Sequence, residues 1–166
     1  MIVIGVDPAF SKKGFWSAKI DSANKTVEFI RSKDVIEFTD MIKTLVGSDV
    51  YVCIENSNLD NVTFKKSKNP GKAARYSRDA GKNQAVSQLA VTHTQALLGK
   101  EYVHTISGSS KSKGWKKEGD IFTAIVKSDG YVLLSPARNQ DQRDAYIIAT
   151  MGLRYFNLQT KLKKQS

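Results

Sequence analysis

The sequence has 166 residues, 40% of them apolar, and one cysteine, Cys53. This length suits one domain, 1–166, with a sizeable core; a single cysteine excludes an internal disulfide, and no run of about 18 apolar residues is present to span a membrane. The formal net charge of +10 is concentrated, because residues 61–117 hold twelve Lys or Arg against two Asp or Glu, whereas residues 1–50 hold seven of each. Such a concentration favours a polyanionic partner, and nucleic acid over a membrane because no amphipathic basic helix accompanies it.

The chain begins with the apolar run Ile-Val-Ile-Gly-Val, which ends on Asp7. Neither face of the run is charged, so we expect a central strand buried on both faces. Pro8 ends this strand, since proline cannot donate to a ladder. A strand at the first residues leaves no room for a signal peptide, and we expect the protein to act in the cytoplasm of a bacterial or phage-infected cell.

Alternating apolar and polar residues predict two further strands at 14–20 and 26–31, so three antiparallel strands open the chain. Apolar residues at helical spacing from Phe38 then predict a helix. The next strand, at 50–54, is apolar on both faces and also ends on an acid, Glu55. A second carboxylate is therefore expected at the end of a core strand.

Polar and basic residues over 56–80 and 107–117 carry no sustained periodicity and predict two basic loops, the first of them mobile. Between these loops, an apolar stripe over 82–98 predicts a helix. His93 lies on that stripe, so a core or interface histidine is expected rather than a metal ligand. The remaining elements are a strand at 102–106, a short helix at 121–126 and an extended piece at 131–134.

The last element is a helix that Asn139 is expected to cap, with Gln142 as its reciprocal partner at the third position. Asp141 and Asp144 fall in its first turn, three residues apart, and should project from the same side. Acids at a helix N-terminus are also ordinary dipole-stabilising residues, so this pair alone does not define a site.

The order of the elements brings the acids together. The two strands that are apolar on both faces should lie side by side at the centre of the sheet, which makes Asp7 and Glu55 neighbours. The last helix, packed over the same edge, adds Asp141 and Asp144. Four carboxylates without a matching Lys or Arg network would repel one another unless cations lay between them. Hard oxygen ligands suit Mg²⁺ or Mn²⁺, and two such ions can activate water for phosphodiester hydrolysis.

Three motifs resemble the RuvC-type Holliday junction resolvases of the RNase H-like superfamily: Ile-Gly-Val-Asp7-Pro, the strand end Ile54-Glu55, and Asp141-Gln-Arg-Asp144-Ala-Tyr-Ile-Ile-Ala. The resemblance runs through nearly the whole chain. It implies an α/β fold with a five-stranded mixed sheet, three antiparallel strands first, flanked by helices. It also implies that the four acids are catalytic and bind two Mg²⁺ or Mn²⁺ ions per subunit, in a homodimer that acts on four-way DNA junctions.

The sequence departs from the family pattern in two places. Ala9 replaces the usual glycine after Asp-Pro, and the aromatic residue that often follows the strand-four acid is absent at 56–59, with Phe64 and Tyr76 as candidates to replace it. The residues expected to contact DNA are basic or aromatic and lie in the two loops. They are Lys65, Lys66, Lys68, Lys72, Arg75, Arg78, Lys111, Lys113, Trp115, Lys116 and Lys117.

The expected activity is therefore metal-dependent hydrolysis that resolves four-way junctions by paired symmetric nicks. Three alternatives remain open. A less structure-selective RNase H-like nuclease would act on flaps, other branched DNA or RNA/DNA hybrid. An actin- or sugar-kinase-like ATPase could use Asp7 and Gly14, although such folds need a second related half. A non-catalytic DNA-binding module would use the basic segment alone and would leave the four acids without a role.

Overall fold

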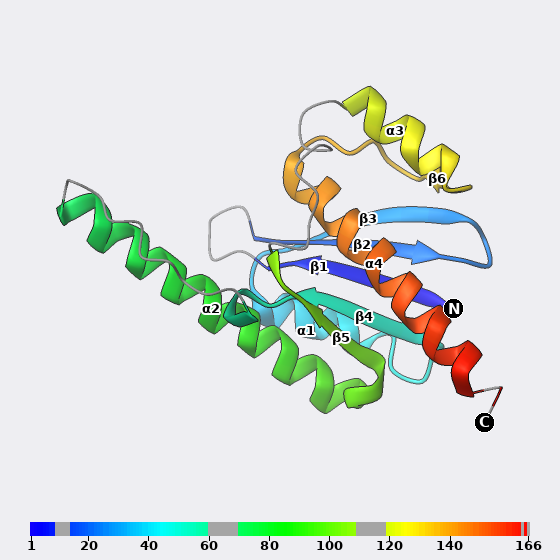
Figure 1. Ribbon diagram of the computed structural model, residues 1–166, viewed down its shortest axis with the longest axis horizontal. Coiled ribbons are helices and arrows are strands. Elements are labelled where there is room, and N and C mark those ends of the chain that lie inside the picture. Colours follow the sequence, from blue (N-terminus) through cyan, green and yellow to red (C-terminus); the bar gives the residue numbers. More distant parts are fainter. Residues whose placement is uncertain (9–13, 60–69, 109–118, 164, 166) are drawn as a thin grey trace.

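The computed structural model describes residues 1–8, 14–59, 70–108, 119–163 and 165. Its centre is a mixed sheet with the strand order β5-β4-β1-β2-β3-β6 (Figure 1). The strands are β1 (Ile2–Asp7), β2 (Phe15–Asp21), β3 (Thr26–Ser32), β4 (Val50–Glu55), β5 (Val103–Ile106) and β6 (Val132–Leu133). The helices are α1 (Val35–Lys43), α2 (Pro70–Leu98), α3 (Gly119–Ser128) and α4 (Gln140–Lys163), with 3₁₀ turns at Ser57–Leu59 and Lys100–Tyr102.

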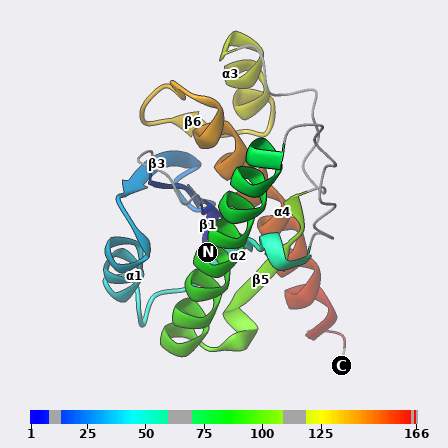
Figure 2. The same cartoon turned by 90° about the vertical axis from the view of Figure 1, so that its left-hand side faces the viewer.

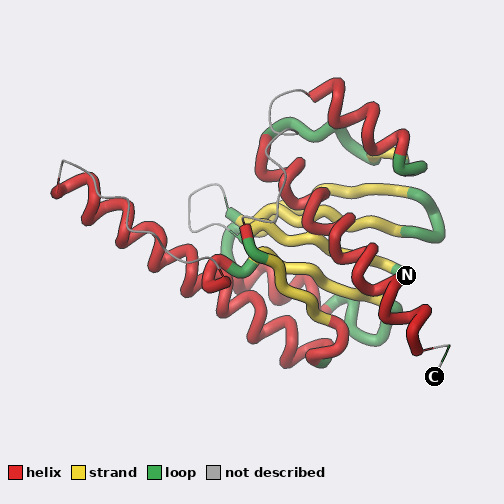
Figure 3. Tube along the Cα trace, viewed as in Figure 1, coloured by secondary structure: helices red, strands yellow, loops and turns green. Residues whose placement is uncertain are grey.

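The directions of the strands follow the prediction. β1, β2 and β3 are antiparallel neighbours, and β4 and β5 run parallel to β1. Figure 3 shows the strands in yellow between helices in red. The predicted α/β fold is confirmed, as is the adjacent central placement of β1 and β4. The predicted count of five strands is one short, because the extended piece after α3 pairs with β3 as the two-residue strand β6. A strand of two residues is too short to show alternation in the sequence.

Helices cover both faces of the sheet (Figure 1). One face packs against α1 and α2, where Phe15 stacks on Phe38 with ring centroids 5.6 Å apart. The other face packs against α3 and α4, where the ring of Phe122 meets that of Tyr146 edge-on at 5.3 Å. Cys53 is fully buried on this second face, and burial raises the pKa of its thiol to about 12, which confirms it as a small core residue.

The predicted loop over 56–80 is wrong in its last part, because α2 begins at Pro70. Proline is favoured in the first turn of a helix, where its missing N–H costs nothing. The buried residues of α2 start only at Ser87, so its first half has no core face and therefore no apolar periodicity that the sequence could reveal. That half extends beyond the sheet (Figures 1 and 2). Residues 60–69, and 109–118 of the second loop, lie outside the described residues.

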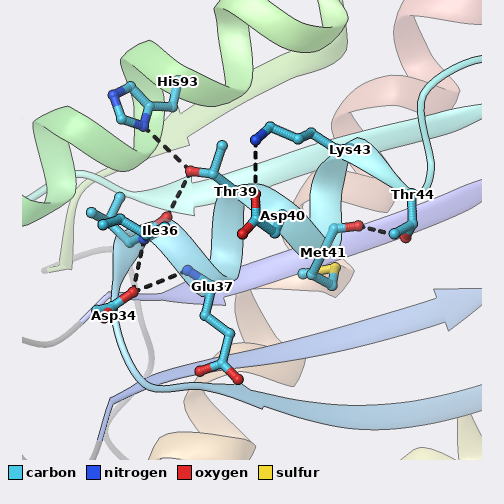
Figure 4. A network of polar contacts seen from close by, with 10 residues as sticks. Asp34, Ile36, Glu37, Thr39, Asp40, Met41, Lys43, Thr44 and His93 are labelled. Carbon is cyan, nitrogen blue, oxygen red and sulfur yellow. Dashed lines mark hydrogen bonds and ion pairs between the residues drawn. The ribbon is translucent and has the colours of Figure 1, made fainter.

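A polar contact joins the two helices of the first face. Asp34 caps α1, since its Oδ1 accepts from the backbone nitrogens of Ile36 and Glu37 at 2.9 and 3.0 Å. One turn further on, Oγ1 of Thr39 lies 3.3 Å from Nδ1 of His93 on α2 (Figure 4). His93 is half-buried in this contact, in agreement with the prediction of a histidine at an interface between elements.

Candidate active site

The parallel pairing of β1 and β4 places Asp7 beside Glu55. The register pairs Gly5 with Cys53 and Val6 with Ile54. Asp7 and Glu55 are the next residues of the two strands, so the acids lie side by side at the carboxyl ends. Residues two apart on a strand project to the same face. Gly5 and Cys53 both face α4, because a side-chain atom added at Gly5 would meet the α4 backbone and Cys53 lies against Gly152 of that helix. Asp7 and Glu55 therefore share the α4 face of the sheet.

The docking of α4 brings its first turn to the same edge. A Cβ at Gly5 would collide with the backbone of Ala145 and Ala149, and one at Gly152 would meet the side chains of Val3 and Cys53. The helix α4 therefore runs opposite to β1: its later residues lie over earlier residues of β1, farther from Asp7. The N-terminus of α4 consequently lies over the carboxyl end of β1, where the strand acids are.

A reciprocal cap determines where α4 begins. The backbone nitrogen of Gln142 donates to Oδ1 of Asn139 at 2.9 Å. In return, Oε1 of Gln142 accepts from the backbone nitrogens of Arg138 and Asn139 at 2.6 and 3.1 Å. The predicted capping pair is confirmed. Asp141 lies in the first turn of the helix, as predicted, whereas Asp144 follows in the second turn.

The two helix acids differ in their surroundings. Asp144 is 4% exposed, and Nε2 of Gln140 donates to its Oδ2 at 3.4 Å. It lies one turn before Ile148, which packs against Cys53 of β4, so Asp144 is on the β4 side of the helix. Asp141 is half-exposed and lies one turn before Ala145, which packs with the β2 and β3 residues. Asp144 therefore lies on the Glu55 side of Asp7 and Asp141 on the opposite side, so the expectation that both acids project from the same side is wrong.

A hollow of about 240 Å³ opens on that opposite side. Its lining residues are Trp16, Arg31, Asn139 and Asp141. Trp16 is the residue of β2 that pairs with Asp7, and Arg31 of β3 pairs in turn with Trp16. Neither Trp16 nor Arg31 was expected at the site from the sequence. Alternation along the strands could have placed both side chains on one face, but only the strand register puts them in line with Asp7.

No protein-family model matches this sequence, and no curated protein matches it. Among solved structures, the chain is similar to T. thermophilus RuvC in complex with Holliday junction substrate. The sequence identity is 14% and the TM-score 0.49, over 95% of this chain and 96% of that chain. A likeness this distant says nothing about activity, which has to be inferred from the residues of the chain itself.

The carboxylates at the carboxyl ends of β1 and β4 and at the start of α4 are ligands that suit a hard divalent cation. Asp7, Glu55, Asp141 and Asp144 offer only carboxylate oxygens, the ligand type that Mg²⁺ and Mn²⁺ prefer. The strand register and the helix docking bring the backbones of these residues to one edge. Among the residues that the structure describes, however, no three His, Cys, Asp or Glu side chains are grouped so that they could hold a metal ion. A metal would therefore require the carboxylates to turn toward one another.

The predicted DNA contacts fall into two sets. Lys72, Arg75 and Arg78 lie exposed on the first half of α2, where Nε of each arginine is 3.9 Å from a carboxylate oxygen of Asp79. Tyr76, a candidate for the missing aromatic, is 63% exposed on the same half. The other predicted contacts, together with Ala9 and Phe64, lie outside the described residues. They are Lys65, Lys66, Lys68, Lys111, Lys113, Trp115, Lys116 and Lys117.

None of the described helices combines the length and the apolar content that crossing a membrane requires.

Proposed function

We propose that this protein is a metal-dependent, structure-selective DNA endonuclease that cuts four-way junctions. The observation that carries the proposal is that Asp7 and Glu55 directly follow the paired residues Val6 and Ile54 at the ends of adjacent parallel strands. The first turns of α4, which bring Asp141 and Asp144, pack on the same face of the sheet. Acids from three separate elements at one sheet edge are difficult to explain by folding alone, because like charges that converge destabilise a fold. The motifs that resemble RuvC-type resolvases contain the same four residues.

The four carboxylates would hold Mg²⁺ or Mn²⁺, with two ions as the expected number. When bound, these ions supply an activated water and stabilise the leaving oxygen of the cut strand. The protein provides the positions: β1 and β4 fix two of the acids on a buried sheet, and the Asn139 cap fixes the start of α4. Burying a carboxylate such as Asp144 costs free energy that donors and cations offset, and Gln140 supplies one donor.

The exposed first half of α2 supplies the proposed DNA-binding surface. Lys72, Arg75 and Arg78 share it, and the fold does not bury any of them. Their charges can therefore contact phosphates without a loss of packing, and the release of counterions from the DNA would favour binding. The basic residues at 65–68 and 111–117 are proposed to extend this surface.

Two symmetric nicks across a junction need two sites related by a two-fold axis, so we propose that the protein acts as a homodimer. Leu89 of α2 is 46% exposed, which suits a contact with a second copy. Leu97, on the same predicted stripe, instead packs against the core cluster of the α1 and α2 face. Leu89 is therefore the candidate for the subunit contact, and Leu97 is not.

Two alternatives predict different substrates. A less structure-selective RNase H-like nuclease would cut flaps or RNA/DNA hybrid as fast as a junction. A non-catalytic DNA-binding module would bind the junction and cut nothing. The positions of the four acids are the same under each alternative, so substrate preference has to be measured.

The deciding experiment incubates the purified protein with end-labelled four-way junction, flap, RNA/DNA hybrid and linear duplex, each with Mg²⁺, Mn²⁺ or a chelator. Denaturing gels report the cuts. Paired nicks at symmetric positions of the junction, dependent on the metal and faster than on the other substrates, are expected. Equal cutting rates on flap or RNA/DNA hybrid would show the less selective nuclease rather than a junction resolvase. Binding without any cut would contradict the nuclease proposal.

A further inference from the structure

The hollow beside Asp7 combines an aromatic ring, a guanidinium, an amide and a carboxylate, supplied by Trp16, Arg31, Asn139 and Asp141. Hydrolysis by the four acids does not require Trp16 or Arg31. Arg31 is exposed, and Trp16 is half-buried, with part of its ring packed against the core cluster of the α3 and α4 face. The rest of the indole is therefore accessible from the hollow while its position is held by packing.

The register shows how close this hollow lies to the proposed chemistry. Asp7, Trp16 and Arg31 are consecutive partners across β1, β2 and β3. Directly paired residues of antiparallel strands project to the same face, with Cβ atoms about 5 Å apart. On the other side of β1, Glu55 follows Ile54, the partner of Val6, so it lies beside Asp7 at the end of β4. A substrate phosphate at the acids would consequently have the hollow within the reach of one nucleotide.

The residues that line the hollow suit a nucleobase better than a phosphate. Asp141 repels a phosphate, so the hollow itself is unsuited to the anionic backbone. A flat indole stacks on any nucleobase, and such contacts are sequence-tolerant because every base has a π-face. Arg31 carries the opposite charge at the rim, where it can meet the backbone of the same nucleotide. The volume of about 240 Å³ lies below that of pockets for drug-sized ligands, which suits a single ring system.

We propose that this hollow receives one unpaired nucleobase next to the cut phosphodiester, stacked on Trp16, with Arg31 holding the adjoining phosphate. The inference rests on the proposed nuclease function and adds to it a reason for structure selectivity. Duplex DNA keeps its bases stacked and paired, and extracting one base costs free energy. This cost is lower at a branch point, where the stack of base pairs is interrupted. Trp16 and Arg31 are thus positioning residues that favour a cut beside an unpaired base.

Tryptophan emission gives a direct test, because the chain has two tryptophans and the variant Trp115→Phe leaves only Trp16. Junction DNA with one labelled arm is added to this variant until the anisotropy of the label shows that binding is saturated. A chelator prevents cutting during the titration. Quenching of Trp16 emission by the junction, and less quenching by linear duplex at equal saturation, is expected. Saturated binding without a change in emission would overturn the inference while leaving the nuclease proposal intact. A wild-type protein, with Trp115 unchanged, that neither binds the junction nor cuts it in the presence of metal would instead defeat the nuclease proposal, and the inference with it.

A second test separates stacking from a purely structural role. Trp16→Ala should lower kcat/KM for the junction by about 10-fold, whereas Trp16→Phe, which keeps a stacking ring, should stay within about threefold. An abasic site scanned across the nucleotides that flank the cut should slow the wild type at one position by a similar factor. At that position the Trp16→Ala variant should show no further loss, because both changes remove the same stacking interaction. If the losses of kcat/KM caused by Trp16→Ala and by the abasic site multiply at every position, Trp16 does not contact the base.

Discussion

The backbone of Ala149 in α4 lies directly against Gly5 of β1, with the α carbon of Ala149 only 2.6 Å from where a Cβ on Gly5 would be. The atoms in the way belong to a helix backbone, which cannot rotate aside as a flexible side chain can. This contact determines the distance between α4 and the sheet. It therefore also determines how near the helix acids come to Asp7.

Gly5→Ala should lower the free energy of unfolding by about 3 kcal/mol, because an extra methyl group in a filled interface forces the backbone to shift. It should also slow DNA cutting by displacing the first turn of α4. Urea unfolding and the junction assay measure the two effects. Gly81→Ala, in α2 with open space around the added atom, is the matched control and should not destabilise the protein. Equal stability of the two variants would contradict this account of the docking.

Replacing any one of the four acids by its amide should slow cutting by about 100-fold or more, which corresponds to about 2.7 kcal/mol of activation free energy. The variants are Asp7→Asn, Glu55→Gln, Asp141→Asn and Asp144→Asn. Junction affinity should be unchanged or higher, because each variant removes one negative charge near the phosphates. Asp40→Asn, at an exposed residue of α1 on the other face, is the control and should cut normally. Near-normal cutting by two of the four variants would sink the assignment.

The double variant Arg75→Gln with Arg78→Gln should weaken junction binding. The slope of log affinity against log salt should decrease by about 0.9 for each phosphate that the protein no longer neutralises, hence by about 1.8 if both arginines bind DNA. The midpoint of thermal unfolding should hardly change, since exposed ion pairs such as those to Asp79 contribute little. The same measurements on Lys43→Gln with Lys127→Gln, two exposed lysines elsewhere, serve as the comparison. Identical salt slopes for all three proteins would place the DNA away from α2.

The stability of the protein should fall as the pH decreases below about 6.5, the pKa of histidine in an unfolded chain. Burial lowers the pKa of His104, whose ring stacks on Tyr155 with centroids 3.8 Å apart. As the pH decreases, His104 therefore becomes protonated in the unfolded state before it does in the folded state, which lowers the free energy of unfolding. This loss levels off once the pH is below the pKa of His104 in the folded state. His104→Phe keeps the stacked ring and should flatten the dependence between about pH 7.5 and 5.5 in urea unfolding. An unchanged dependence in this variant would assign the effect to other groups.

The proposed homodimer can be tested with two leucines of α2. Leu89→Glu should give a monomer that remains folded, because this side chain is 46% exposed. Leu97→Glu should instead destabilise the fold, because Leu97 packs against the core. Analytical ultracentrifugation and circular dichroism distinguish the two results. A wild-type protein that sediments as a monomer at micromolar concentration, with and without junction, would refute the dimer.

The two strand acids could be found from the sequence because their signal is local: an apolar run that stops on a carboxylate marks the end of a buried strand. The Asn139 and Gln142 cap was equally readable, since both partners lie within four residues. Trp16 and Arg31 could not be connected with Asp7 in this way, because their relation depends on the pairing of three strands. The start of α2 was missed for another reason, namely that apolar periodicity reports packing rather than helix formation.

The first half of α2 has a thermodynamic consequence. A helix segment without buried residues is held mainly by its own propensity, and short isolated helices are marginal in water. Gly81, in the interior of α2, weakens this segment further, by about 1 kcal/mol relative to alanine. Part of the free energy of DNA binding would then be spent on ordering the helix, so the measured affinity would understate the strength of the phosphate contacts. A change that merely stiffens this segment would tighten binding without adding any contact to the DNA.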